Sequence, residues 1–377
     1  MRFTLLEKFF GGTLVVYTLF DLSEREIWHH FLEKTASKDI YFTPEYLEIY
    51  ERNGEGKAQL FLYQDGEDFI YYPFLVRNLQ DIPITDEVRK KYGELYDITT
   101  PYGYGGPITN TTDGVKKKQL FRQFEDSFRS YCDQHKIISE FVRFHPFIRN
   151  DLDYQDIDSL LNRHTIYIDL ALDLEEIWAN YDNKNRNRLR KAEANEYFTM
   201  VHRPANEFET FMNLYYKTMD KKHAYEYYYF QREFFENQVE LLSGQLELIE
   251  VIMDNKVIMS CFFMHHGEFI HYHLLGSDED YLKYSPNNSL IHYAVGWAKA
   301  KGLKVLHLGG GYSGDHDTLY RFKKRFNKYG DLPFYIGKRI RNGLIYQELI
   351  KSLPVANNYF PLYRHPDLIA ENHLSKQ

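Results

Sequence analysis

The chain has 377 residues, 44% of them hydrophobic, and a formal net charge of −8 at neutral pH. This length is typical of two domains, and the hydrophobic content excludes an intrinsically disordered protein. The negative charge argues against a protein that coats nucleic acid over a wide surface, while a local basic patch stays compatible with it. The 33 tyrosines indicate half-hydrated clefts or simply a tyrosine-rich core.

Two cysteines, Cys132 and Cys261, occur in the sequence. This number excludes a disulfide framework and a cysteine-rich zinc site, and it is typical of a reducing compartment. No stretch has the length and purity of a membrane helix. The apolar run at 12–20 lacks a cleavage site and predicts a strand rather than a signal peptide. We therefore expect a cytoplasmic protein, with peripheral membrane association left open.

The first half of the chain predicts an alternation of strands and helices. In chain order it predicts a strand at 13–20, a helix at 22–35, a hairpin at 58–76 around Asp65-Gly66, a glycine-rich loop at 99–108, a helix at 114–135 and a strand at 140–147.

The second half repeats this outline. It predicts a strand at 165–170, helices at 174–196, 208–220 and 228–242, a strand meander at 246–277, a helix at 285–301, a strand at 305–308, a helix at 317–326 and a strand at 334–338. The repeat predicts a duplicated α/β (α+β) domain, each copy a mixed, largely antiparallel sheet flanked by helices. We place the boundary in the polar segment 149–163, which gives domains at 1–155 and 156–350 and a tail at 351–377.

The most informative segment is "VLHLGGGYSGDHDTLYRFKKRF" at 305–326. It runs from an apolar strand through Gly309, Gly310 and Gly311 into a helix that carries Lys323 and Lys324. Glycines leave the backbone open to a close ligand, and a cationic helix beside them suits an anion or a developing oxyanion. The alternative is a flexible connection followed by a solvated basic face.

A second basic segment lies at 183–197, where Arg186 and Arg190 are spaced to share one helix face. This pattern indicates phosphate or nucleic-acid contact, or a solvated cationic face. A third group combines Thr218, Lys221 and Lys222 with neighbouring tyrosines, which suits a nucleotide or sugar phosphate. Cations at the end of a helix dipole explain the same residues equally well.

Several familiar sites are missing from the sequence. The histidines form no metal pattern, and there is no G-x-S-x-G, P-loop or Rossmann fingerprint. We therefore expect neither a metal nor a bound cofactor.

Taken in order, five segments resemble the Fem family of peptidoglycan-bridge aminoacyltransferases and the wider FemAB-like acyltransferases. They are "TTPYGYGGPI" (99–108), "NRNRLRKAEANE" (185–196), "YYKTMDKKHAYEYYYF" (215–230), "SPNNSLIHYAVGWAKAKG" (285–302) and "LHLGGGYSGDHDTLYRFKKRF" (306–326). The resemblance extends from about residue 42 to residue 340. It implies two tandem GNAT-like domains and an enzyme that transfers an aminoacyl or acyl group to an amine of a cell-envelope precursor.

The resemblance also implies roles for particular residues. Lys323 or Lys324 would stabilise the tetrahedral intermediate, although Arg325 replaces the glycine of the family's "FKKGF" segment. Lys221 would bind the phosphates of the acceptor. The further substrate-binding candidates are Thr218, Tyr215, Arg186, Arg190, Gly309, Gly310, Gly311, Tyr102 and Tyr104.

The donor implied by the resemblance is aminoacyl-tRNA or acyl-CoA, and the acceptor is a phosphorylated cell-envelope precursor. The GNAT pyrophosphate loop, Q/R-x-x-G-x-G/A, is not found before the helix at 285, which weakens acyl-CoA as the donor. Candidate general bases are Asp315, Asp317 and His307, or the leaving oxygen of the donor. Two alternatives stay open: an acyl-CoA-dependent N-acyltransferase of capsule or exopolysaccharide synthesis, and a non-catalytic module that binds the precursor. The sequence leaves the oligomeric state open.

Overall fold

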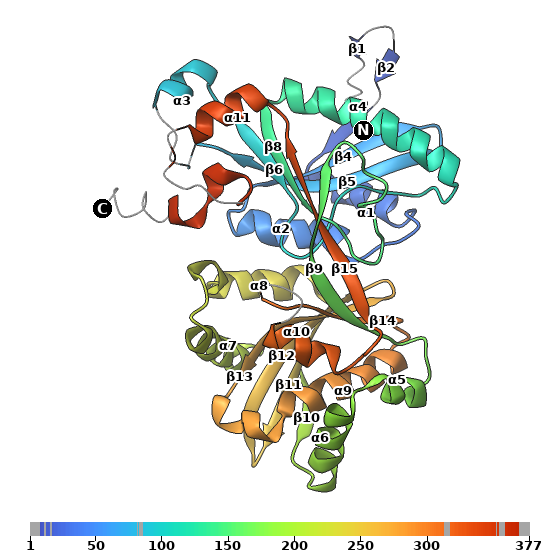
Figure 1. The fold of residues 1–377 in the computed structure, drawn as a ribbon, viewed down its shortest axis with the longest axis vertical. Coiled ribbons are helices and arrows are strands. Elements are labelled where there is room, and N and C mark those ends of the chain that lie inside the picture. Colours follow the sequence, from blue (N-terminus) through green and yellow to red (C-terminus); the bar gives the residue numbers. More distant parts are fainter. Residues whose placement is uncertain are drawn as a thin grey trace. The chain divides into compact units, whose positions relative to one another are not determined.

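The computed structural model describes residues 8–10, 13–15, 17–80, 82, 86–312, 317–351, 353 and 359–368. The chain divides into two units, which are described separately: unit 1 contains residues 1–161 and 334–377, and unit 2 contains residues 162–333 (Figure 1). Among the described residues, no helix is long and apolar enough to cross a membrane.

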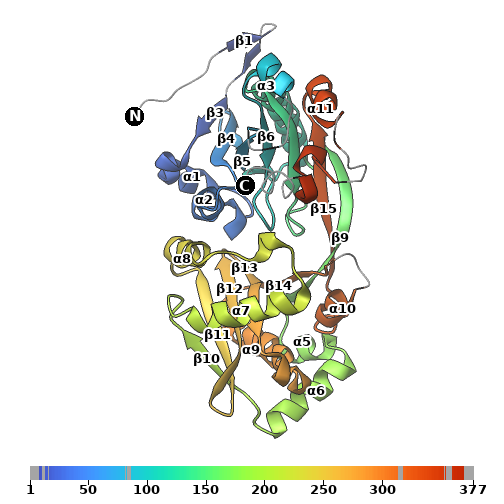
Figure 2. The same ribbon diagram turned by 90° about the vertical axis from the view of Figure 1, so that its left-hand side faces the viewer.

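Unit 1 has helices on both faces of a mixed sheet (Figure 2). Its strands follow the order β15-β8-β6-β5-β4-β3, with β7 beside β5 and a separate small hairpin of β1 and β2. The strands are β1 (Lys8–Phe10), β2 (Thr13–Val15), β3 (Tyr17–Phe20), β4 (Lys57–Asp65), β5 (Asp68–Asn78), β6 (Tyr96–Thr99), β7 (Ile108–Thr109), β8 (Ile137–Arg143) and β15 (Asp331–Ile340). The helices are α1 (Arg25–Leu32), α2 (Pro44–Arg52), α3 (Asp86–Tyr92), α4 (Gly114–Gln134) and α11 (Gly343–Ile350), with short 3-10 turns η1 (Leu22–Glu24), η2 (Ile40–Phe42) and η5 (Leu362–Arg364).

Aromatic side chains form most of the core of unit 1. Phe61 of β4 packs edge-on against Phe124 and Phe128 of α4, with ring centroids 5.7 and 5.1 Å apart. The same core buries Tyr72, Tyr131 and Tyr154, so part of the tyrosine content belongs to the core, as one of the two interpretations of the composition predicts. A buried ion pair crosses the same core, where Arg341 contacts Glu140 of β8.

Unit 2 has the strand order β10-β11-β12-β13-β14-β9. Its strands are β9 (Asp158–Asp169), β10 (Thr199–Arg203), β11 (Leu246–Met253), β12 (Lys256–His266), β13 (Phe269–Ser277) and β14 (Val305–Gly310). Its helices are α5 (Leu174–Asn180), α6 (Asn183–Ala194), α7 (Glu209–Lys222), α8 (Arg232–Leu241), α9 (Pro286–Ala300) and α10 (Thr318–Lys324), with 3-10 turns η3 (Glu226–Tyr228) and η4 (Glu279–Tyr284).

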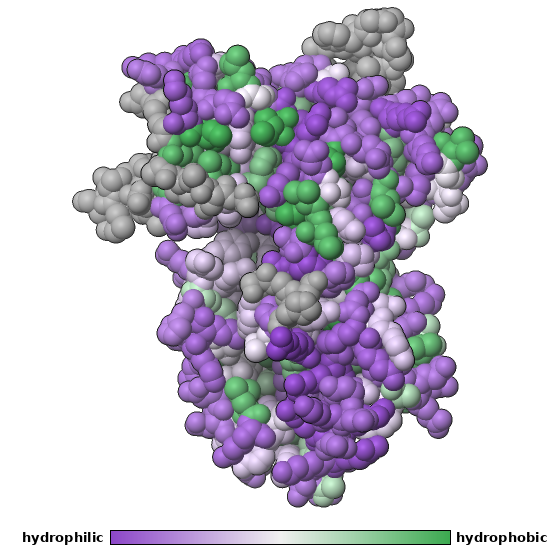
Figure 3. Space-filling view, viewed as in Figure 1, coloured by the Kyte–Doolittle hydropathy of each residue, from purple (hydrophilic) through white to green (hydrophobic). Residues whose placement is uncertain are grey.

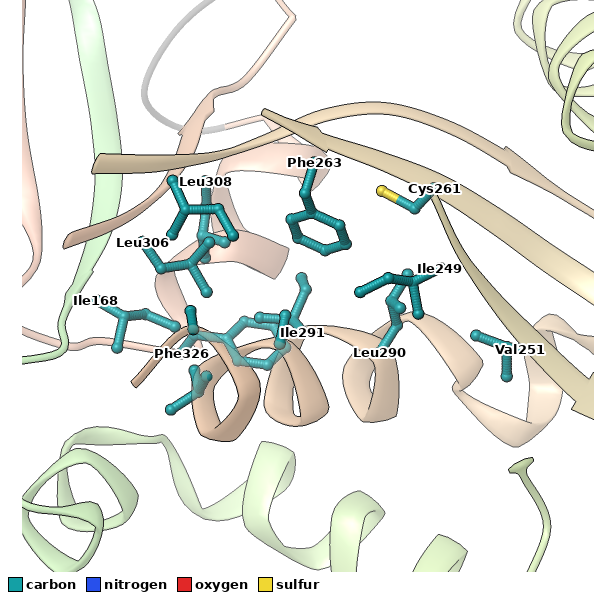
Figure 4. Packing of buried hydrophobic residues seen from close by; sticks show 14 of the residues in the cluster. Ile168, Ile249, Val251, Cys261, Phe263, Leu290, Ile291, Leu306, Leu308 and Phe326 are labelled. Atoms are coloured by element: carbon teal, nitrogen blue, oxygen red, sulfur yellow. The ribbon is translucent and has the colours of Figure 1, made fainter. Parts of the chain in front are cut away.

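The side chains of neighbouring residues in one strand are buried on opposite faces of this sheet. Phe263 of β12 belongs to the core that also holds Leu306 and Leu308 of β14 and Ile291 of α9 (Figure 4). Phe262, one residue earlier, lies 4.5 Å from the ring of Phe211 on α7. The sheet is therefore covered on both faces, and α10 joins the first face through its aromatic residues.

The two units share one sheet pattern. In each, a parallel pair follows an antiparallel meander, β6 with β8 and β13 with β14, and one long helix, α4 or α9, connects the parallel strands. The last strand is exchanged: β9 pairs with β14 of unit 2, and β15 pairs with β8 of unit 1. The α/β fold with mixed sheets flanked by helices is confirmed.

Some predicted boundaries differ from the structure. The single helix predicted for 174–196 is wrong, because Tyr181 and Asp182 adopt extended backbone and the Asp182 carboxylate caps a new helix, α6. The polar segment 149–163 contains the first residues of β9, so it is partly strand. Residues 334–350 group with unit 1 rather than with the second half, because β15 pairs with β8.

Candidate active site

The strand β14 bends where its glycines begin. Its antiparallel register with β9 shifts between His307 and Gly309, so one extra residue bulges out of the ladder. Gly309 has a φ of +72°, a conformation that glycine adopts without strain. The end of β14 lies against α10.

Lys323 of α10 reaches this bend from the other side. Its Nζ donates a hydrogen bond to the carbonyl oxygen of Gly310 at 2.7 Å, and the residue is only 7% exposed. A Cβ added at Gly309 would lie 3.4 Å from the same Nζ. Burial, more than the neighbouring cations, lowers the pKa of Lys323 to about 7. A lysine with such a pKa can hold or release a proton near neutral pH.

Arg163 holds the rest of the glycine run, and Asp317 begins the helix that follows it. The Asp317 carboxylate caps α10 by accepting a hydrogen bond from Tyr320 N at 2.8 Å. Arg163 of β9 donates from Nη1 to the carbonyl oxygens of Gly311 and Tyr312, at 2.7 and 2.9 Å. The backbone from Gly309 to Tyr312 is thus held by side chains from two different elements.

The parallel strands β13 and β14 separate next to this site. They pair through three residues, from Phe269 with Val305 to His271 with His307, although β13 continues to Ser277. Both histidines are buried, and their rings meet edge-on at 5.5 Å. Among the residues that the structure describes, the backbone of β13 beyond His271 has no strand partner on that side.

The candidate general bases have different surroundings. His307 Nε2 lies 2.9 Å from the hydroxyl of Thr165, and Asp317 caps α10 as described above. Asp315 lies outside the described residues. Among the described residues, no group of histidine, cysteine, aspartate or glutamate side chains is arranged to hold a metal ion.

Lys324, the second lysine predicted to be catalytic, lies next to Lys323 in sequence and in a different environment. Its Nζ forms an ion pair with Asp331, and its side chain is partly exposed. Burial lowers its pKa. Lys323 therefore faces the glycine run and Lys324 faces a carboxylate.

The residues predicted to bind phosphate at the end of α7 make contacts in different places. Lys221 is exposed and its Nζ lies 2.7 Å from a carboxylate oxygen of Glu279. Thr218 is buried, donates to Leu214 O at 2.8 Å and accepts from Ser277 N at 2.9 Å. The buried hydroxyl of Tyr215 donates to the backbone oxygen of Tyr228 at 2.8 Å. Thr218 and Tyr215 therefore use their hydroxyl groups in hydrogen bonds to the protein backbone.

The helix α6 carries Arg186 and Arg190, and the surface in the lower part of the view, where Figure 1 places α6, is largely hydrophilic (Figure 3). Arg186 donates to Trp178 O at 3.4 Å, and Arg190 lies over the Trp178 ring at 5.5 Å. Arg325, which departs from the family pattern, lies 3.8 Å from a carboxylate oxygen of Asp182. Arg186 and Arg190 therefore contact Trp178 of α5, and Arg325 contacts the residue that caps α6.

Tyr102 and Tyr104 belong to unit 1. Tyr102 is 40% exposed and its carbonyl oxygen accepts a hydrogen bond from Tyr46 at 2.7 Å. Tyr104 is buried and packs edge-on against Tyr41, with centroids 5.1 Å apart. A Cβ at Gly103 would lie 2.3 Å from the Tyr41 ring, so the loop between the two tyrosines requires glycine.

Sequence reasoning missed two cations at the glycine run. Arg163 lies in the polar segment in which the domain boundary is predicted, and the resemblance assigns phosphate binding to Lys221 rather than to Lys222. Lys222 Nζ lies 5.2 Å from the centroid of the Tyr312 ring. The helical spacing of about 100° per residue gives adjacent lysines different directions, but the sequence does not say which of them faces the site.

Comparisons with known proteins agree with this fold. Residues 179–324 match the family model of the acetyltransferase (GNAT) domain. FemX has the same fold, with a TM-score of 0.66 and 14% identity over 88% of this chain and 98% of the FemX chain. A protein of unknown function from Bacteroides thetaiotaomicron has a TM-score of 0.53 and 13% identity over 86% and 99% of the two chains. No curated protein sequence matches the chain.

The predicted resemblance is therefore confirmed at the level of the fold and of the enzyme class. The matched segment contains α6, the separating strands β13 and β14, and Lys323. The protein is an acyltransferase that has the fold of FemX and whose residues 179–324 match the acetyltransferase (GNAT) domain.

Proposed function

We propose that the protein transfers an acyl or aminoacyl group to an amine of a cell-envelope precursor, either a peptidoglycan-type peptide or a nucleotide-linked sugar. The carrying observation is Lys323, a buried lysine that is hydrogen-bonded to Gly310 O and forms no salt bridge with any described carboxylate. The resemblance of five sequence segments to the Fem family supports a cell-envelope acceptor and an aminoacyl-tRNA donor.

In this proposal the acceptor amine attacks the carbonyl carbon of the donor. A C–N bond forms, and the bond to the tRNA oxygen or the CoA sulfur breaks. Negative charge develops on the carbonyl oxygen, and the ammonium of Lys323 stabilises it at the end of β14. The amine proton leaves to the departing oxygen or sulfur, or to a base such as Asp317 or His307.

The lysine assignment is tested with matched variants. Lys323→Gln should lower kcat by roughly 100- to 1000-fold, the usual cost of removing an oxyanion partner. Lys324→Gln is the control, because Lys324 pairs with Asp331 instead, and it should keep most of the activity. Equal losses in the two variants would contradict the assignment.

The donor and acceptor are tested with labelled aminoacyl-tRNA and acyl-CoA against a panel of amines. Transfer from aminoacyl-tRNA to a precursor peptide would support the proposal. Absence of transfer from either donor to every amine, with folded protein, would count against it.

A second candidate is an acyl-CoA-dependent N-acyltransferase of capsule or exopolysaccharide synthesis. The early separation of β13 and β14 favours it, because unpaired strand backbone can hydrogen-bond an extended donor arm. Calorimetric binding of CoA, together with transfer to an amino sugar, would support this candidate. Protection of aminoacyl-tRNA without CoA binding would contradict it. A protein that binds the precursor and transfers nothing would instead be a non-catalytic binding module.

A further inference from the structure

One glutamine of α8 occupies a position that an apolar side chain would normally fill. The helix is buried through Phe234, Phe235 and Gln238, and Phe235 packs against Phe211 of α7 with ring centroids 5.6 Å apart. Gln238 follows Phe234 by four residues, so both lie on the face of α8 that packs against the rest of unit 2. Gln238 is only 1% exposed, which is uncommon for glutamine because burial removes its amide group from water.

The amide group of Gln238 uses only one of its two polar atoms. Its Nε2 lies 3.3 Å from Nε2 of His273 on β13. Among the residues that the structure describes, its Oε1 has no hydrogen-bond partner, although this atom is inaccessible to solvent. Buried polar atoms without a partner are rare and costly in folded proteins. A glutamine at this core position therefore indicates that a bound group supplies the missing hydrogen bond.

His273, the partner of Gln238, is uncharged at neutral pH. Desolvation, and to a smaller degree the neighbouring His271, lower the pKa of His273 to about 3. The Nε2 of Gln238 is a donor, so Nε2 of the neutral His273 ring accepts and the ring proton lies on Nδ1. The two side chains therefore offer one acceptor, Gln238 Oε1, and one donor, His273 Nδ1, without a formal charge.

The Gln238–His273 pair lies beside the point at which β13 and β14 separate. His271 and His307 are the last residues that these two strands pair. His273 follows two residues later on β13, and Gly310 follows three residues later on β14. With about 3.3 Å per residue, both positions lie within about 10 Å of the last pair along their strands. His273 is partly exposed, so a substrate that reacts at the end of β14 can also reach this pair.

We propose that Gln238 and His273 bind an amide group of a substrate, whose N–H donates to Gln238 Oε1 and whose oxygen accepts from His273 Nδ1. A secondary amide supplies both partners and carries no charge, so it matches a pair of side chains that is itself uncharged. A charged group would lose its hydration at this site without gaining an opposite charge. This inference rests on the proposed function and deepens it, because it identifies a chemical group that the substrate carries near the reacting centre.

The first experiment is NMR of the full-length protein labelled with ¹⁵N at glutamine and histidine. The variants Gln238→Met and His273→Phe assign the two signals by their absence. The probes are acetyl-alanine methylamide, N-acetylglucosamine and CoA, all of which carry secondary amides, and the matched controls without one are alanine and glucosamine. At least one probe should shift both signals, and the controls should shift neither. Equal shifts with the controls, or no shift with any probe, would overturn the proposal.

The same titrations identify the source of the amide. Binding of acetyl-alanine methylamide would assign the site to a peptide acceptor, and binding of N-acetylglucosamine would assign it to a sugar acceptor. Binding of CoA would assign it to the donor. The probe with the lowest dissociation constant decides between them.

The second experiment compares variants of two glutamines in α8. Gln238→Met should weaken binding of that probe by about tenfold, the effect of one hydrogen bond. Its midpoint of thermal unfolding should equal or exceed that of wild type, because no buried polar atom is then left without a partner. Gln231→Met, at the exposed N-cap of the same helix, is the control and should keep the affinity within about twofold. His273→Phe tests the other partner and should also weaken binding.

Two outcomes would overturn the proposal here. Wild-type affinity in both Gln238→Met and His273→Phe would do so, and so would a lower unfolding midpoint of Gln238→Met together with wild-type affinity, which would show a purely structural role.

Binding and transfer are measured separately, so the two proposals can fail independently. A protein that binds an amide probe through Gln238 but transfers no acyl group would contradict the proposed function and leave the amide site standing. If the protein transfers an acyl group, Gln238→Met should raise KM for the amide-bearing substrate by about tenfold, with little change in kcat. An unchanged KM would contradict the amide site and leave the proposed function standing.

Discussion

Gly311 lies against the carboxylate of Asp317, so closely that an added Cβ would be 2.1 Å from Oδ2. The same carboxylate starts α10 by capping Tyr320 N. Since α10 carries Lys323, the space at Gly311 determines where that lysine meets the strand end. The third glycine of the run is therefore required by the helix that follows it.

Gly311→Ala should displace the start of α10 and lower kcat/KM by up to about 100-fold, because small shifts of positioned groups are costly in catalysis. Steady-state kinetics of acyl transfer would measure the loss. Gly296→Ala in α9 is the control: no atom lies within 4 Å of the added Cβ, and alanine should stabilise the helix by about 0.5–1 kcal/mol. Wild-type kinetics in Gly311→Ala would contradict the steric argument.

Lys323→Met should change how stability depends on pH. Burial lowers the pKa of Lys323 from 10.5 to about 7, so between these values the unfolded chain binds a proton that the folded chain does not. The cost of the buried charge is complete below pH 7 and is relieved as the pH rises toward 10.5. The stability of Lys323→Met relative to wild type should therefore fall with rising pH, by about 1.4 kcal/mol per unit across this window. Denaturant unfolding at several pH values measures it, and parallel pH profiles would contradict it.

Asn185→Ala should destabilise unit 2 by about 1–3 kcal/mol, the cost of leaving a buried polar group without its partner. Asn185 Oδ1 accepts a hydrogen bond from Asn288 Nδ2 at 2.8 Å, and both side chains are buried. This bond joins the starts of α6 and α9. The exposed Asn195 at the end of α6 is the control, and Asn195→Ala should cost less than about 0.5 kcal/mol by urea unfolding. A similar cost for both variants would show that the buried bond is not important.

Arg341→Met should destabilise unit 1 by about 3–5 kcal/mol, because it leaves the buried charge of Glu140 unpaired. Arg341 Nε donates to Glu140 Oε2 at 3.0 Å, and both side chains are almost inaccessible to solvent. Lys57→Met is the control, since Lys57 pairs with Glu51 on the surface and such pairs contribute less than about 1 kcal/mol. Thermal unfolding of the two variants would distinguish the buried from the exposed pair, and equal shifts would refute the distinction.

Short-range patterns predicted much of the fold. The turn at Asp65-Gly66 correctly located the hairpin of β4 and β5, and the apolar periodicity located α4 and α9 within a residue or two. The predicted helix at 174–196 was wrong because basic helix-forming residues continued past Asp182, whose capping side chain outweighed them. The exchange of β9 and β15 depends on pairing between strands that are far apart in sequence, which local sequence patterns do not predict.

The candidate site was predicted in part for the same reason. The glycine run and the lysines of the next helix lie close together in sequence, so the sequence pattern predicted that Gly310 and a lysine of this helix belong to one site. The structure shows that the lysine in contact with Gly310 is Lys323. The partner of Lys221 is Glu279, 58 residues away, and no spacing rule connects them. The roles of the predicted site residues stay predictions until the variants above are measured.

The exchange of β9 and β15 also has a consequence for how the chain folds during synthesis. Unit 1 receives its last strand from residues 331–340, which come after nearly all of unit 2 in the chain. The ribosome must therefore complete all of unit 2 before unit 1 can close its sheet, and β8 waits meanwhile with one edge unpaired. In the usual order an N-terminal domain is complete before the next one is made, whereas unit 1 of this protein completes its sheet only after unit 2 has been synthesised.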